Sequence, residues 1–137
     1  MISRIVNSAI EQALKSELMY RHGAILFSRR SILSKGYNKF DVTQLQNNNI
    51  SVHAEMSCLK SFRRDVKYNK CHILVVRINS SNKLVNSRPC KDCIASLRNI
   101  SIKNIYYSNE AGEILCERVK HSISNHVSSG NRYQRRL

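Results

Sequence analysis

Long apolar runs and export signals are both missing from this chain of 137 residues. No apolar run approaches the length of a transmembrane helix, about 18 residues, so we expect no membrane span and no membrane partner. The N-terminal residues lack the apolar core of a secretory signal peptide. We therefore expect an intracellular protein, in the cytoplasm or nucleus, whose five cysteines are reduced thiols.

Acidic side chains are also scarce: 9 Asp and Glu stand against 23 Lys and Arg, which gives a formal net charge of +14. The basic residues comprise 13 arginines and 10 lysines. Because the arginine guanidinium suits bidentate contact with phosphate, this excess favours a polyanionic partner, single-stranded DNA or RNA, over a neutral nucleoside. A generally basic, solvated surface is the alternative interpretation.

Two short motifs carry the chemistry of the chain. They are His-Ala-Glu at residues 53–55 and Pro-Cys-Lys-Asp-Cys at residues 89–93. One imidazole and two thiolates form a donor set suited to Zn²⁺, and three protein ligands leave a fourth position for water. In this order the motifs form the H-x-E … P-C-x-x-C signature of zinc-dependent nucleobase deaminases. We predict one zinc ion per chain, held by His53, Cys90 and Cys93.

Glu55 is predicted to carry protons rather than to bind the metal. Zinc lowers the pKa of bound water from about 15.7 to about 7, and Glu55 would pass the released proton to the ring nitrogen and the leaving ammonia. A structural zinc with Cys58 as its fourth ligand is the alternative. At 3.6 residues per turn Cys58 is turned roughly 140° away from His53, which disfavours that ligand set. Cys58, Cys71 and Cys116 are instead expected to be buried.

The length and the hydrophobic pattern predict a single domain, residues 1–137, in which helices alternate with strands. Helices are predicted over 2–18, over 53–64 and from Pro89 onwards, and strands over 23–27, 32–37, 73–76 and 105–108. The polar segments 39–52 and 79–88 are expected to be loops. The turn of the first hairpin carries Arg29 and Arg30, which gives it a basic tip suited to nucleic-acid contact.

The segment after Ser108 allows two interpretations. Residues 109–112 resemble a turn, after which 113–119 would return as an antiparallel fifth strand. Apolar residues also recur there every four positions, as in a helix. Gly112 in the first turn of a helix is costly, which favours the strand.

The last residues, 128–137, form a basic tail. Arginines stand there beside an aromatic ring, a combination suited to phosphate contact and base stacking. The residues are Arg132, Tyr133, Arg135 and Arg136. A solvated end without a role is the alternative.

Taken together, the motifs and the order of elements resemble the cytidine deaminase-like superfamily over nearly the whole chain. The resemblance implies a three-layer α-β-α sandwich with a five-stranded mixed sheet and both zinc-bearing helices on one face. It also implies four substrate contacts. Asn38 would bind the sugar, the Ala54 backbone N–H and the Arg88 carbonyl would hold the base and its leaving amine, and Tyr106 would pack beside the target base.

The subfamily is less sharply indicated. A histidine first ligand resembles the deoxycytidylate, tRNA adenosine and polynucleotide cytidine deaminases, whereas an antiparallel fifth strand would resemble the free-cytidine deaminases. The tRNA adenosine enzymes commonly carry Glu-Pro-Cys where this chain has Arg88-Pro89-Cys90. This difference disfavours adenosine.

We predict that the chain converts cytosine to uracil in a single-stranded polynucleotide, by attack of zinc-bound hydroxide on C4. A free nucleotide deaminase acting on dCMP or CMP is the alternative. Adenosine-to-inosine conversion in RNA and a non-catalytic nucleic-acid-binding subunit with structural zinc are further alternatives, and the intact Glu55 argues against the last. A homo-oligomer is compatible with each of them.

Overall fold

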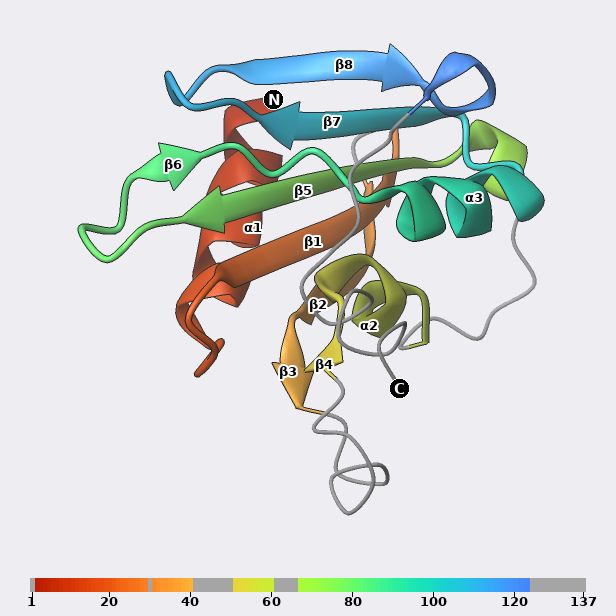
Figure 1. Ribbon diagram of the computed structural model, residues 1–137. Helices are drawn as coiled ribbons and strands as arrows, with labels where there is room; N and C mark the ends of the chain where they lie inside the picture. Colours follow the sequence, from red (N-terminus) through yellow and green to blue (C-terminus); the bar gives the residue numbers. More distant parts are fainter. Residues whose placement is uncertain (1, 30, 41–50, 61–66, 124–137) are drawn as a thin grey trace.

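Helices and strands alternate along the chain, as the hydrophobic pattern predicts (Figure 1). The fold is taken from a computed structural model, which describes residues 2–29, 31–40, 51–60 and 67–123. In chain order the elements are α1 (Ile2–Leu14), β1 (Arg21–Ser28), β2 (Ser31–Tyr37), β3 (Lys39–Phe40), β4 (Ser51–Val52), α2 (Ala54–Lys60), η2 (Tyr68–Lys70), β5 (His72–Ile78), β6 (Leu84–Val85), α3 (Lys91–Asn99), β7 (Asn104–Ser108), β8 (Ile114–Arg118) and η3 (Val119–His121).

A mixed sheet with the strand order β2-β1-β5-β7-β8 forms the centre of the fold. Strands β5 and β7 run parallel, and the other neighbours run antiparallel. The predicted five-stranded mixed sheet is confirmed, and the two-residue β6 adds a sixth strand at the end of β5. Because β8 pairs antiparallel with β7, the strand interpretation of the segment after Ser108 is confirmed and the helical one is wrong.

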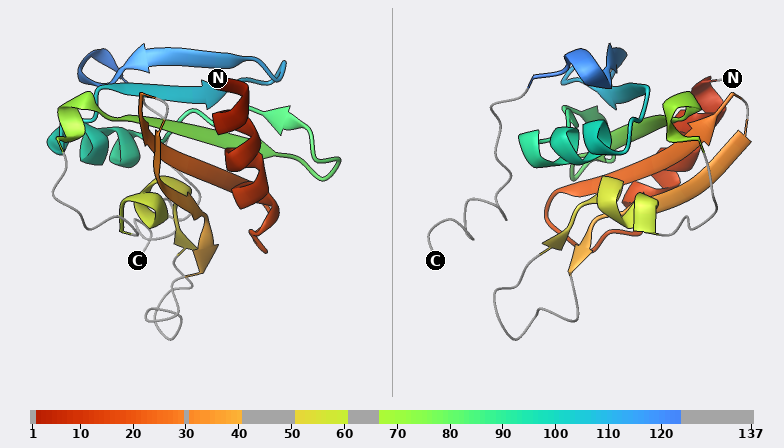
Figure 2. Two further views of the ribbon diagram at one scale, coloured as in Figure 1. Left: turned by 180° about the vertical axis from the view of Figure 1, so that it is seen from behind. Right: turned by 90° about the vertical axis from the view of Figure 1, so that its right-hand side faces the viewer.

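Helices cover both faces of the sheet, so the predicted α-β-α sandwich is confirmed (Figures 1 and 2). We call the two sides the α1 face and the α2/α3 face. Each buries its own apolar cluster, fed by alternate residues of β1 and β5. The α1 face contains Ile5, Ala9, Ala13, Ile25, Phe27, Leu74, Val76 and Ile78. The α2/α3 face contains Ala24, Leu26, Ala54, Cys58, Ile73, Val75, Ile94, Leu97 and Ile105, among others.

Two glycines let the helices approach the sheet closely, one on each face. A Cβ atom at Gly23 would lie 2.0 Å from the carbonyl oxygen of Ala9 in α1. A Cβ atom at Gly36 would lie 2.4 Å from the backbone nitrogen of Cys58 in α2. Any side chain at either position would therefore displace a helix backbone.

Several element boundaries differ from the prediction. Helix α1 ends at Leu14 rather than at residue 18, because the chain tightens into i→i−3 hydrogen bonds and Ser16 then donates to the carbonyl oxygen of Asn38. Pro89 lies outside α3, whose N-cap is Cys90. None of the described helices is both long and apolar enough to cross a bilayer.

Two segments predicted as loops contain short strands. Residues 39–40 and 51–52 pair as β3 and β4, and β6 lies within the polar segment 79–88. Two-residue strands are too short to show a hydrophobic period, so the sequence could not reveal them. Cys58 and Cys71 are buried as predicted, but Cys116 is exposed because β8 is an edge strand of the sheet.

Candidate metal centre and active site

The three predicted metal ligands lie at the N-termini of two helices. His53 precedes α2, and its carbonyl oxygen accepts a hydrogen bond from the backbone N–H of Ser57. Cys90 is the N-cap of α3, and Cys93 lies in the first turn of the same helix. The positive end of a helix dipole favours thiolate over thiol, so this placement suits metal binding.

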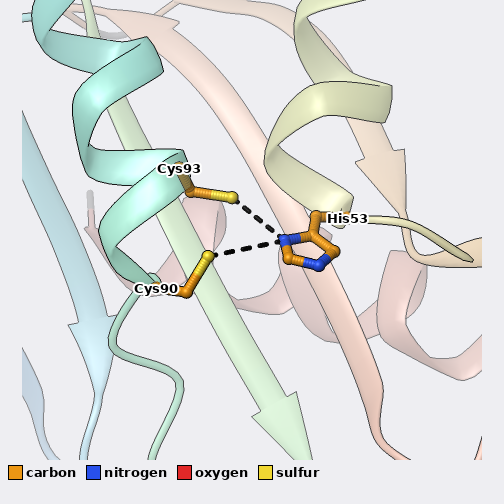
Figure 3. Close-up of side chains that lie close together, drawn as sticks. All are labelled: His53, Cys90 and Cys93. Atoms are coloured by element: carbon orange, nitrogen blue, oxygen red, sulfur yellow. Dashed lines mark hydrogen bonds between the residues drawn. The ribbon is translucent and has the colours of Figure 1, made fainter. Parts of the chain in front are cut away.

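The side chains of the three ligands converge (Figure 3). The Nδ1 atom of His53 lies 3.1 Å from Sγ of Cys93 and 3.8 Å from Sγ of Cys90, and all the ligand atoms lie within 4.8 Å of one another. Zn–S and Zn–N bonds of about 2.3 Å and 2.0 Å in a tetrahedron would separate nitrogen from sulfur by roughly 3.5 Å. The observed distances bracket that value, and the N/S donor set fits zinc.

The electrostatics of the two thiols favour a cation between them. A hydrogen bond from Cys93, helped by His53, lowers the pKa of the Cys90 thiol to about 3. The same contact with Cys90, together with burial, raises the pKa of Cys93. The hydrogen bond with Cys90 also raises the pKa of His53. The Cys90 thiol, with its lowered pKa, and the Cys93 thiol therefore lie beside an imidazole nitrogen at a largely buried site.

Glu55 lies close to this centre without belonging to its ligand group. It is the second residue of α2 and is only 4% exposed. Burial raises the pKa of its carboxyl group, while the charge of His53 and a hydrogen bond with Cys93 partly offset that effect. A buried carboxyl group with a raised pKa beside a metal site has the character of a general acid–base residue.

Cys58 does not join the metal ligands. It is fully buried in the apolar cluster of the α2/α3 face, and burial raises the pKa of its thiol to about 12. Among the described residues the metal-ligand group contains only His53, Cys90 and Cys93. The alternative of a four-ligand structural zinc that includes Cys58 is therefore not supported.

Buried serines anchor the chain just before Cys90. The hydroxyl of Ser87 donates to the carbonyl oxygen of Val75 in β5 at 2.7 Å. The backbone N–H of Ser108, at the end of β7, donates to the Ser87 hydroxyl at 2.8 Å, and the Ser87 N–H donates to the Ser108 carbonyl at 2.9 Å. These bonds tie the cysteine loop to the middle of β5 and to the carboxyl end of β7.

Of the four predicted substrate contacts, three lie on or beside the α2/α3 face. Ala54 is buried at the start of α2. The guanidinium of Arg88 pairs with Glu117 at 3.1 Å and donates to the backbone carbonyl of Ile123. The predicted substrate contact is the backbone carbonyl of Arg88, which these side-chain bonds do not use. Asn38 is buried, and its side chain donates to the Tyr20 carbonyl and accepts from the backbone N–H of His22. Roles in substrate binding remain predictions for all three.

The fourth, Tyr106, is on the wrong side of the sheet for its predicted role. It packs against the α1 face, with its ring centroid 5.6 Å from Phe27 and 5.9 Å from His72. Successive residues of a strand point to opposite faces, so Tyr107 is the tyrosine that faces α3. Its hydroxyl donates to Glu117 at 2.8 Å. This position argues against contact between Tyr106 and a base held near the metal ligands.

The predicted nucleic-acid contacts are mostly beyond the described part of the chain. Arg30, Arg132, Tyr133, Arg135 and Arg136 lie outside the described residues. Arg29 is exposed after the last residue of β1, with a φ of 54°. Because β1 spans eight residues, this tip lies roughly 25 Å along the strand from its first residues.

His22, near the start of β1, belongs to no sequence motif but lies near the metal ligands. Burial, together with the charges of Arg77 and His53, lowers the pKa of its imidazole to about 4. It therefore lies in the electrostatic reach of the metal ligands. Its alternation with Ala24 and Leu26, which are buried under α2 and α3, was the one sequence signal for this position.

Comparison with solved structures supports the fold. Cytidine deaminase from Burkholderia pseudomallei superposes with a TM-score of 0.67 at 13% identity, covering 87% of this chain and 93% of that one. The dCMP deaminase of cyanophage S-TIM5, solved with dCMP and dUMP, gives 0.54 at 21% identity, covering 80% and 85%. Cytidine deaminase from Mycobacterium tuberculosis gives 0.53 at 11% identity, covering 88% and 94%. No curated protein sequence matches significantly.

A half-buried histidine and two buried cysteines at helix N-termini, with a buried glutamate beside them, define a zinc-dependent hydrolytic deaminase. A comparison of the sequence with known families identifies the family. The profile described as "Cytidine and deoxycytidylate deaminase zinc-binding region" matches residues 2–109, and the chain belongs to that family.

Proposed function

We propose that this enzyme converts cytosine to uracil by hydrolysis at C4, with cytosine in a single-stranded polynucleotide as its substrate. The observation that carries the chemistry is the cluster of the half-buried His53 with the buried Cys90 and Cys93, and the buried Glu55 beside it. The observation that favours a polynucleotide is the net charge of +14, which exceeds what one phosphate requires.

In the proposed mechanism the chain's own residues hold the base and move protons. His53, Cys90 and Cys93 would bind zinc, which lowers the pKa of a water ligand to about 7. Glu55, whose pKa is raised by burial, would take a proton from the attacking water and give it to the ring nitrogen. It would then move a second proton, from the added hydroxyl group, to the amine, which leaves as ammonia.

The base is oriented by two backbone groups. The Ala54 N–H would donate to an acceptor of the ring, and the Arg88 carbonyl would accept from the leaving amine. Both groups adjoin metal ligands in the sequence, Ala54 next to His53 and Arg88 two residues before Cys90. The helices that hold the ligands would therefore also set the position of the base.

Mass spectrometry of single-stranded oligonucleotides, free cytosine nucleotides and cytidine after incubation tests this proposal. The zinc-loaded wild type should add about 1 Da per cytosine as an amino group is replaced by oxygen, and Glu55→Ala should not. Affinity for single strands should also fall with log salt, with a slope of about −0.7 per phosphate neutralised. Conversion of adenosine to inosine without any uracil product would refute cytosine as the target.

A free cytosine nucleotide is the second candidate. It is favoured by the family, whose description names deoxycytidylate, and by the similarity to a phage dCMP deaminase. Efficient turnover of dCMP, with oligonucleotides neither bound nor deaminated at low salt, would establish it in place of the polynucleotide.

A further inference from the structure

Arg77 is a basic side chain on the α2/α3 face that the proposed chemistry does not use. It lies at the carboxyl end of β5, paired in register with His22 of β1. Along β5 it alternates with Ile73 and Val75, both of which are buried under α2 and α3. Its side chain therefore points to the same side of the sheet as the metal ligands.

The guanidinium of Arg77 is only partly satisfied. Its Nε atom is buried and has no hydrogen-bond partner within the described ranges. In that same part of the chain, no ion pair joins Arg77 to a carboxylate. A buried donor without a partner is destabilising, and an anionic ligand would supply the missing partner.

The surroundings of Arg77 hold its charge in place without neutralising it. Its guanidinium carbon lies 4.7 Å from the centre of the Tyr20 ring, a cation–π contact that keeps the positive charge. Arg77 and His53 both lower the pKa of His22, so the charges of both lie within electrostatic reach of that imidazole. Because neighbouring strands lie about 4.8 Å apart, the backbones of His22 in β1 and Arg77 in β5 are direct neighbours across the sheet.

This end of the sheet is where a ligand would enter. Parallel strands β5 and β7 both end here, and open α/β sheets bind ligands outside the carboxyl ends of their strands. The N-termini of α2 and α3, which carry the metal ligands, lie on the same face. An anion beside Arg77 would thus belong to the molecule whose base reaches the metal centre.

We infer that Arg77 binds the phosphate attached to the target cytosine nucleotide, either the monoester of a free nucleotide or the diester of a strand. The inference rests on the proposed function, because phosphate is the anionic group that natural carriers of cytosine have in common. A guanidinium offers parallel donors that match phosphate oxygens, and the free Nε supplies one of them.

The test couples removal of the arginine to removal of the phosphate. Wild type and Arg77→Met, both zinc-loaded, are assayed for kcat/KM on dCMP against deoxycytidine. They are also assayed on an oligonucleotide with one deoxycytidine against the same strand carrying a neutral methylphosphonate 5′ to it. For whichever substrate pair carries the recognised phosphate, removing that phosphate should lower kcat/KM of wild type about 10- to 100-fold. The same removal should lower kcat/KM of Arg77→Met less than about 3-fold.

Matched variants separate phosphate binding from general charge and from folding. Arg118→Met removes an equal charge from an exposed position of β8 and should keep the wild-type phosphate dependence. Arg77→Lys keeps the charge but lacks Nε, and should recover only part of the loss. Zinc content and thermal unfolding verify that each variant folds.

Each outcome is decisive. If Arg77→Met loses the phosphate dependence on dCMP against deoxycytidine, the bound phosphate is that of a free nucleotide. If it loses the dependence on the phosphodiester strand against the methylphosphonate strand, the bound phosphate is that of a polynucleotide. Equal phosphate dependence in wild type and Arg77→Met overturns the inference, while the proposed function survives if cytosine is still deaminated. Absence of any Glu55-dependent deamination in all arms overturns the proposed function itself and the inference with it.

Discussion

The α1 face and the α2/α3 face of the sheet are both apolar where their helices pack, but they differ in what else they bury. On the α1 face the additional groups are rings: Phe27 lies 5.3 Å from His72 and 5.6 Å from Tyr106, between centroids. On the α2/α3 face they are polar groups with defined partners: Glu55 of α2, and Ser34 of β2, whose hydroxyl donates to the Cys58 carbonyl. Each central strand contributes alternate residues to both faces.

This difference shows how one sheet separates stability from chemistry. His22 and Gly23 are neighbours in β1, yet Gly23 packs against the backbone of α1 and His22 points toward the metal ligands. Tyr106 and Tyr107 are neighbours in β7 with the same division. Substitutions on the α1 face should therefore change folding energy alone, whereas those on the α2/α3 face should also change metal binding or catalysis.

The largest effect is expected from a metal ligand. Cys93→Ala should lose stoichiometric zinc, all measurable deamination and thermal stability together, because the metal joins α2 to α3. Cys58→Ala removes another buried thiol of the same face and should keep one zinc per chain, at a cost of about 1 kcal/mol. Metal analysis and thermal unfolding measure both. Full zinc occupancy in Cys93→Ala would contradict the ligand assignment.

Next in size is the proton carrier. Glu55→Ala should retain zinc and fold while kcat falls by about 10²–10⁴-fold, the range typical of a lost general acid–base group. Steady-state rates normalised to bound zinc give the measurement. Glu117→Ala, which removes a partly exposed carboxylate from the same face, provides the control and should leave most of the rate. An undiminished rate in Glu55→Ala would place the proton carrier elsewhere.

The two close-approach glycines compare the faces directly. Gly23→Ala and Gly36→Ala should each destabilise the fold by about 1–3 kcal/mol in urea unfolding, because a methyl group must displace a helix backbone. Only Gly36→Ala should also weaken zinc affinity and lower activity, since it displaces α2, which follows His53 and carries Glu55. Equal losses of zinc affinity in both variants would show that the faces are not independent.

The smallest effects are expected from the tyrosine pair. Tyr107→Phe loses a hydrogen bond to Glu117, which should cost about 1 kcal/mol near neutral pH, whereas Tyr106→Phe should be nearly neutral for activity. Burial raises the pKa of Glu117, but hydrogen bonds from Arg88, Tyr107 and Ser122 outweigh it and leave the pKa below its ordinary value.

The stability that this ionised carboxylate confers is present above its ordinary pKa of 4.5 and is lost as the pH falls through the lowered one. The difference between wild type and Tyr107→Phe should therefore shrink in strongly acidic buffer. Thermal unfolding at several pH values measures it. A difference that grows on acidification would rule out the ionised Glu117 as the partner.

Much of the fold was predictable because its signals are local. The apolar runs of β1, β5 and β7 and the one-faced spacing of α1 predicted their elements, and Gly112 decided between strand and helix for β8. The end of α1 was not predictable, because the hydrogen bond from Ser16 to Asn38 joins residues 22 positions apart. The same holds for β6, whose pairing with β5 depends on the tertiary fold.

The metal ligands could be identified from spacing and residue type, while their neighbours could not. His22 and Arg77 carry no motif, and only the β1–β5 register brings them together on the ligand side. Tyr106 shows the converse error. Its position in the predicted fourth strand suggested a role beside the base, but a difference of one residue decides which face a strand residue joins.

The serine bonds before Cys90 have a kinetic consequence. Ser87 is held by Val75 and Ser108 through the protein's own hydrogen bonds, so this half of the site is ordered when the chain folds. The Ser87 and Ser108 amides, bonded to buried partners, should exchange slowly with deuterium whether or not a chelator is present. Zinc uptake by the cysteine pair is then a single bimolecular capture, with a rate that rises linearly with free zinc and has no slow folding phase.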